Sequence, residues 1–164
     1  MEQVAMEDED NTTSAENSIL SIIDKQWSQA QQSEGQRATV TNFLLIIAAG
    51  LQGFVVQRRF DHAALGVALV LIFLGVYGAV ISAKYYERFR MSMCRVGKMI
   101  DTLEKINPNV AIWTAQERAD ELHASRYPVL VRLRLHVLWC ILHIAIAILG
   151  AVDSLVIVLL WWEP

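Results

Sequence analysis

The stretch AALGVALVLIFLGVYGAVISA occupies residues 63–83 and determines the class of fold. Its 21 residues include no charged side chain and no Asn or Gln. A helix needs about 20 apolar residues to cross the hydrocarbon core of a bilayer. A soluble domain of 164 residues, 54% of them hydrophobic, would have too small an interior to bury that much apolar surface. The stretch therefore predicts a transmembrane helix.

Two more stretches have the same character, and both are long enough to cross a bilayer. Residues 39–57 are uncharged and end at Arg58, so a short loop would join them to residues 63–83 as a helical hairpin. In residues 135–162, Trp139 and Trp161 are about 33 Å apart at helical rise, the spacing of two interfacial aromatic belts. The sequence predicts an all-α membrane bundle with three transmembrane helices.

The segments outside these spans are polar. Residues 1–16 carry six acidic residues and no basic one, which predicts a disordered tail. Apolar residues recur at helical spacing over 17–35, which predicts an amphipathic helix that packs on other cytoplasmic helices or lies in the membrane interface. Few basic residues lie on its polar face, and this favours packing.

The long polar segment after the second span is also helical in pattern. The second span continues as a helical arm over 84–106 and stops before Pro108, because the residue preceding a proline is disfavoured in a helix. Thr114 and Glu117 form a capping box, which predicts a short helix over 114–127.

The basic residues predict the orientation. Ten of the fourteen Lys and Arg lie between Lys84 and Arg134, and two lie in the 58–62 loop. Loops rich in Lys and Arg stay in the cytoplasm. We therefore expect a multi-pass protein of the cell inner membrane with a cytoplasmic N-terminus and an external C-terminus.

A stripe of residues separated by steps of three and four follows the second helix, as in a left-handed helix–helix contact. Its members are small inside the predicted span and large and apolar beyond it. The stripe either packs against helices of the same chain or forms a parallel stem between subunits, and we favour a homo-oligomer. This seam comprises Gly75, Ala79, Ser82, Tyr86, Phe89, Met93, Val96, Ile100 and Leu103.

The third span carries a polar stripe. His136, His143 and Ser154 share a face with small residues, and Asp153 lies beside them at membrane depth. The stripe has three interpretations: a helix-packing interface, a pathway for water or ions, or a metal or haem site. One metal ion cannot bind both histidines of one chain, because they lie about 10 Å apart. Asn42 and Gln52 in the first span either hydrogen-bond between helices or line a pore.

Sequence motifs that indicate catalysis, such as a Walker loop, GxSxG or HExxH, do not occur. We predict that the protein is not an enzyme and needs no cofactor or metal. Acidic residues interrupt the basic stretch 88–105, so it favours anionic lipid headgroups over nucleic acid. Cys94 and Cys140 lie in different segments, and we expect both to be free.

The hairpin with a cytoplasmic arm, which includes residues 84–89 (KYYERF), resembles the SLATT type of small bacterial membrane effectors. It is also similar to the RipA-family octameric membrane proteins. The likeness covers residues 17–127 in architecture and hydropathy. It implies an oligomeric effector that disturbs the inner membrane when a cytoplasmic partner signals, in anti-phage defence.

Three functions are open at this point. The first is a homo-oligomer that forms or gates a pathway through the bilayer. The second is a passive membrane anchor that recruits a soluble protein through the arm at 84–127. The third is a cofactor-carrying redox subunit, which would be coloured when purified.

Overall fold

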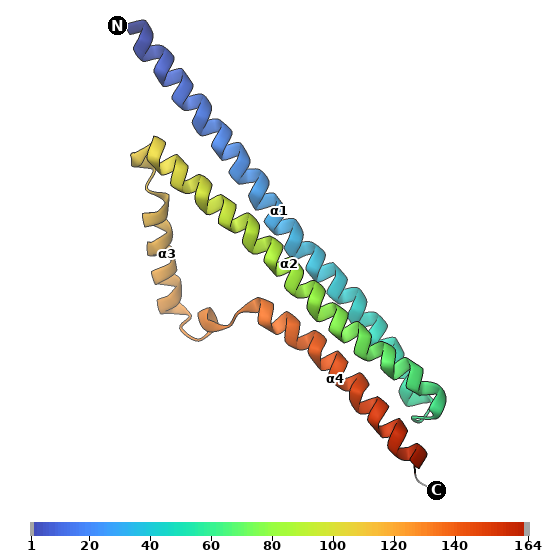
Figure 1. Cartoon of the computed structure of the whole chain (residues 1–164). Helices are drawn as coiled ribbons and strands as arrows, with labels where there is room; N and C mark the ends of the chain where they lie inside the picture. The colour runs from blue at the N-terminus through green and yellow to red at the C-terminus, as the bar shows by residue number, and fades with distance from the viewer. Residues whose placement is uncertain (1, 163–164) are drawn as a thin grey trace. The chain divides into compact units, whose positions relative to one another are not determined.

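The computed structural model describes residues 2–162, and over this range the chain is helical with no strand (Figure 1). Three of its helices, α1, α2 and α4, are long and apolar enough to cross a membrane. The predicted all-α class and the three apolar helices are confirmed. The four α-helices are α1 (Glu2–Gln57), α2 (Leu65–Ile106), α3 (Ile112–Arg126) and α4 (Leu135–Trp162).

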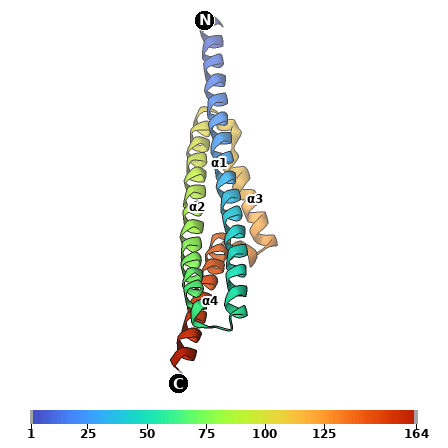
Figure 2. The same ribbon diagram turned by 90° about the vertical axis from the view of Figure 1, so that its right-hand side faces the viewer.

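The described chain divides into two compact units. The apolar unit comprises residues 34–86 and 134–162, where the second half of α1, the first half of α2 and α4 lie side by side (Figures 1 and 2). The charged unit comprises residues 2–33 and 87–133, which hold the first half of α1, the second half of α2 and α3. Both α1 and α2 contribute to both units.

Helix α1 is a single helix where the sequence predicted a tail, an amphipathic helix and a span. It begins at Glu2, so the predicted disordered residues 2–16 are helical in this structure, and residue 1 lies outside the described range. Acidic residues near a helix N-terminus are favoured by the helix dipole. No proline interrupts the helix, and its three glycines, Gly35, Gly50 and Gly53, cost only about 1 kcal/mol each.

The amphipathic part of α1 is covered along one face of the helix. Ile19, Ile23 and Gln26 are half-buried, and Ala30 and Ser33 are buried. Leu20 and Trp27 are 49% and 45% exposed. The covered positions follow one another at steps of three and four, which is the spacing of an amphipathic helix.

The turn between α1 and α2 has a defined geometry. Arg59 N–H donates to Val56 O at 3.0 Å and Phe60 N–H to Val55 O at 3.3 Å, a Schellman motif at the end of α1. Arg59 and Phe60 have φ of 50° and 59°. Asp61 then caps the 3-10 helix His62–Ala64, accepting from the Ala64 N–H at 3.1 Å. These bonds set the short connection that makes α1 and α2 a hairpin.

The core of the apolar unit consists of aliphatic side chains from all three helices. Val55 of α1, Ala68 of α2 and Ile157 of α4 are at most 1% exposed and form one cluster with Ala64. A second cluster contains Ala48, Leu71 and Ile146. Small residues in these clusters allow the helices to approach closely, which is how helices associate when lipid surrounds them.

Helices α2 and α4 touch along their backbones at glycines. A Cβ added at Gly75 would lie 2.4 Å from Ala147 N, and one at Gly150 would lie 2.7 Å from Ala68 O. Neither position has room for a side chain. The two helices are therefore in direct backbone contact at two levels.

Within one chain, the residues of the predicted oligomer seam are covered by neighbouring helices, and their contact with a second copy stays a prediction. None of the nine residues is exposed. Gly75 contacts α4 of the same chain, and Val96, Ile100 and Leu103 are 3–7% exposed within the charged unit. The small-then-large pattern was interpreted correctly as helix packing, but a stripe cannot show which helix packs on it.

We expect Gly75→Ala to destabilise the apolar unit. The new methyl group would collide with the α4 backbone and force the helices apart, at a cost of about 1–3 kcal/mol. Gly53→Ala is the matched control, because no atom lies within 4 Å of its added Cβ. Unfolding by denaturing detergent in mixed micelles measures the difference. Equal stability of the two variants would contradict the close approach.

Candidate functional site

Three helices of the apolar unit meet at one polar point. His143 of α4 is 1% exposed, and its Nε2 shares a hydrogen bond of 3.2 Å with Oγ1 of Thr41 on α1. Thr41 is also 1% exposed. This bond joins α1 to α4 in the interior of the unit.

Gly78 of α2 makes room for the imidazole. A Cβ added at Gly78 would lie 2.3 Å from His143 Nδ1, so the ring occupies the space that any other residue would fill with its side chain. His143 Nδ1 has no hydrogen-bond partner among the described residues. Because one ring nitrogen of a neutral imidazole is a donor and the other an acceptor, a buried ring with one unpaired nitrogen is costly.

Asp153 lies on the same buried face of α4. It is 4% exposed, and its Oδ2 lacks a hydrogen-bond partner within residues 2–162. Ten residues separate it from His143, which is about 15 Å along a helix, so the two side chains lie at different levels of the unit. The buried face of α4 consists of His143, Ile146, Gly150, Asp153 and Ile157.

Ser82 of α2 adds a third polar group to the interior. It is 1% exposed, and its hydroxyl is without a partner in the described chain. We call His143, Asp153, Ser82 and Thr41 the polar interior of the apolar unit. Its members lie on all three helices. His143, Asp153 and Ser82 each have a buried polar atom without a hydrogen-bond partner among the described residues.

The remaining predicted site residues lie away from this interior. His136 is half-buried and stacks on Tyr86 with ring centroids 3.8 Å apart. Ser154 donates to its own helix at Gly150 O, 2.8 Å away. Asn42 is exposed, and Gln52 is half-buried with its Oε1 unpaired in the described chain. The predicted stripe is thus divided, and only His143 and Asp153 belong to the polar interior.

Sequence reasoning missed Thr41 and Gly78. In the part of α1 that belongs to the apolar unit, the buried positions are Arg37, Thr41, Leu44, Ala48 and Val55, one residue away from the face that Asn42 suggested. Nearly every residue of that span is apolar, so hydropathy cannot show which face is buried. The steps of four, three, four and seven from Arg37 were the available signal.

Arg37 was also missed. Its side chain is 4% exposed, forms an ion pair with Glu34, and lies 5.5 Å from the centroid of the Trp139 ring. At the other end of α4, His62 and Trp161 are in ring contact with centroids 4.7 Å apart. Each end of α4 is therefore held by an aromatic contact to α1 or to the turn before α2.

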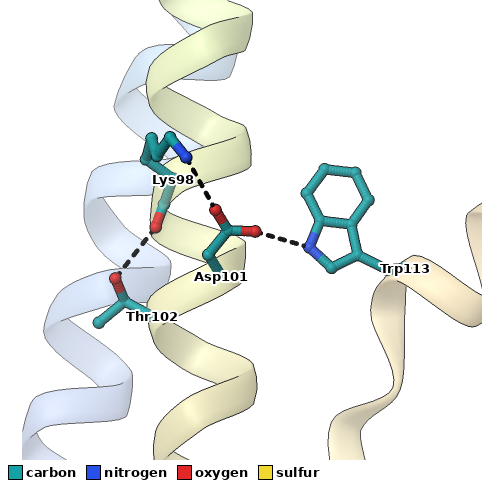
Figure 3. Close-up of polar contacts among 4 residues, drawn as sticks. All are labelled: Lys98, Asp101, Thr102 and Trp113. Atoms are coloured by element: carbon teal, nitrogen blue, oxygen red, sulfur yellow. Dashed lines mark hydrogen bonds and ion pairs between the residues drawn. The ribbon is translucent and has the colours of Figure 1, made fainter.

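The charged unit has a separate polar contact at the start of α3, shown in Figure 3. Trp113 Nε1 donates to Asp101 Oδ1 at 3.0 Å, and Lys98 Nζ donates to Asp101 Oδ2 at 3.3 Å. Trp113 N–H donates to Glu104 Oε1 at 2.9 Å. Two carboxylates of α2 thus hold the first turn of α3.

The predicted capping box is wrong. Helix α3 begins at Ile112, two residues before Thr114, and its N-cap residue Ala111 makes no side-chain cap bond. The Glu104 carboxylate takes the role of the cap from a different helix. By contrast, α2 ends at Ile106 before Pro108, as predicted.

A cavity of about 340 Å³ lies between α2 and α3 beside the Trp113 ring. It contains basic, acidic and apolar groups in one open groove. Gly97 forms part of its floor, and an added Cβ there would contact the Trp113 ring at 3.6 Å. Its lining residues are Arg90, Met93, Cys94, Gly97, Lys98, Asp101 and Trp113.

Metal-ligand clusters of three or more His, Cys, Asp or Glu side chains do not occur in the described part of the chain. Cys94 is exposed and Cys140 half-buried, and both are free, as predicted. Comparisons with protein-family models, curated proteins and solved structures found no match. The resemblance to SLATT-type and RipA-family proteins therefore stays a prediction.

We expect Asp101→Ala to loosen α3. The substitution removes the acceptor of the Trp113 indole, so amide hydrogen exchange should accelerate over residues 112–126. Asp120→Ala, on the exposed surface of α3, is the matched control. Unchanged exchange in Asp101→Ala would show that Glu104 alone holds the helix.

The same contact should depend on pH. The hydrogen bonds from Lys98 and Trp113 hold the pKa of Asp101 below its ordinary value. A carboxylate with a lowered pKa stabilises the folded form above its unfolded pKa, and the contribution is lost as pH falls through the folded pKa. We therefore expect the Trp113 indole N–H resonance to hold its folded position at neutral pH and to shift only below pH ~4. The Asp101→Asn variant should remove this titration.

Proposed function

We propose that the chain is an integral protein of the cell inner membrane and that α1, α2 and α4 cross this membrane. The outer surface of the apolar unit supports this proposal. Phe43, Ile46 and Phe73 are 63%, 70% and 64% exposed. Apolar surface of this extent is unfavourable in water but is solvated by lipid. The excess of basic residues between Lys84 and Arg134 favours a cytoplasmic charged unit, a cytoplasmic N-terminus and an external C-terminus.

Within that membrane protein, we infer that the polar interior forms or gates a pathway for ions or water. The observation that carries this inference is the burial of two ionisable side chains, His143 and Asp153, in an apolar unit. Each has a buried polar atom without a hydrogen-bond partner among the described residues. An ionised carboxylate near the centre of a bilayer costs about 2.5–3.5 kcal/mol on the insertion scale. A protein that only anchors a partner has no use for a buried carboxylate that carries this energetic cost.

In this proposal, the arrangement of α2 and α4 is the closed form of the pathway. Gly78 packs on the His143 ring, and the contacts of Gly75 and Gly150 hold α2 against α4 along the part of α4 between His143 and Asp153. Opening would require α4 to move away from α2. We propose that a cytoplasmic protein binding to the arm at 84–127 supplies that force, and that several copies act together as a homo-oligomer.

The subunit contact of such a homo-oligomer should lie outside the α2 seam. Asn42 is exposed on α1, and Gly50 and Gly53 have open space where a Cβ would be. An amide facing lipid gains about 1 kcal/mol when it bonds to a neighbouring helix. If the family resemblance holds, such an oligomer would act in bacterial defence.

A passive anchor is the second candidate. The compact charged unit, with α3 bonded to α2 through Trp113, favours it because this unit offers a partner a defined surface. This function needs no ionisable group inside the bilayer. Substitutions in the polar interior therefore distinguish the two candidates.

We expect Asp153→Leu to abolish ion flux through proteoliposomes while the oligomer persists. Ser154→Ala is the matched control, since that hydroxyl bonds only its own helix, and it should conduct normally. Asp153→Asn separates charge from polarity. Unchanged flux in Asp153→Leu would exclude the pathway, and loss of function in Phe89→Asp alone would favour the anchor.

A further inference from the structure

The segment between α3 and α4 exposes a run of apolar side chains. Val129, Leu130 and Leu133 are 73%, 62% and 55% exposed, and Val131 is 49% exposed. None of the four lies in a helix long enough to span a bilayer. A run of this kind in water is unfavourable, so it indicates a surface that something covers.

The backbone of this segment is largely satisfied by itself. Val131 N–H donates to Tyr127 O at 3.1 Å, and the next two N–H groups donate to Val129 O at 3.2 Å and Leu130 O at 3.0 Å. Pro128 has no N–H to satisfy. A segment whose N–H groups are already paired can enter a medium of low polarity without the usual penalty for unpaired backbone groups.

The charge of the segment has one sign. Residues 122–135 include Arg126, Arg132 and Arg134 and no Asp or Glu. An arginine stem lies along apolar surface while its guanidinium reaches a polar layer. The guanidinium forms paired hydrogen bonds with a phosphate, and the cytoplasmic leaflet is negatively charged.

Chain connectivity places the segment next to a span. Only Arg134 lies between Leu133 and Leu135, the first residue of α4, and this stretch of chain spans at most about 7 Å when extended. This step rests on the proposed function, in which α4 crosses the bilayer. Leu133 then lies at the lipid headgroups however the two units are oriented.

We propose that residues 126–133 bind the surface of an anionic membrane. Val129, Leu130, Val131 and Leu133 enter the boundary between headgroups and acyl chains, and Arg126 and Arg132 bind lipid phosphates. The segment is therefore a lipid contact that lies in the chain between α3 and the span α4. Lipid charge at this segment affects both the end of α3 and the start of α4.

The test uses the full chain in vesicles, with Cys94→Ser and Cys140→Ala as background. An environment-sensitive fluorophore is attached at Val131→Cys, or at Gln116→Cys on α3 as the control position. In vesicles containing phosphatidylglycerol, we expect shallow nitroxide lipids to quench the probe at 131 and acrylamide to reach it poorly. The probe at 116 should show the reverse.

The second part of the experiment varies the charge of the protein segment and of the lipid. Replacing Arg126 and Arg132 by Gln should weaken binding of the segment roughly fivefold for each arginine. Vesicles of phosphatidylcholine alone, which lack anionic lipid, should likewise weaken binding of the unsubstituted segment. Equal quenching in both lipids would overturn the proposal.

The remaining outcomes separate this proposal from the proposed function. If the protein resists carbonate extraction but residue 131 is as accessible to acrylamide as residue 116, only the lipid contact is wrong. Energy transfer between labelled copies without nitroxide quenching would show that a second copy covers the segment and would also overturn it. Release by carbonate would instead overturn the membrane insertion itself.

Discussion

The apolar unit depends on the backbone contact between α2 and α4. Gly75 and Gly150 remove the side chains that would hold the helices apart, and Gly78 leaves space for an imidazole. Because the hydrophobic effect does not drive helices together in lipid, this close approach and its dispersion contacts must hold the unit together. The contact also determines that His143 is enclosed and within reach of Thr41.

Charge divides the chain into two regions with different physics. In the apolar unit, ion pairs and ring contacts occur at the ends of α4, at Arg37 and at His62. The charged unit instead relies on carboxylates of α2, which hold α3 through Trp113. Helices α1 and α2 run through both regions, as the proposed function requires of a protein that receives a signal in one region and responds in the other.

Much of the fold could be predicted from sequence because its elements are set by local composition. The ends of α1, α2 and α4 at Gln57, Ile106 and Trp162 agree with the predicted ones, since charge and proline mark them. Asp153 and His143 were identified for the same reason, as ionisable groups in apolar sequence. The exposure of Asn42 within one chain could not be predicted, because an almost wholly apolar helix gives no sign of which face its neighbours cover.

By itself, the sequence determined that three segments are apolar over enough residues to span a bilayer, where α1, α2 and α4 end, and where the basic residues gather. These properties depend on residues near one another in the chain. The tertiary structure alone decided that the α2 stripe packs within one chain, that Glu104 caps α3, and that Thr41 and Gly78 surround His143. Each of these depends on which helices become neighbours. The neighbours are determined by how the side chains of one helix fit against those of another, and residues close in sequence do not show this fit.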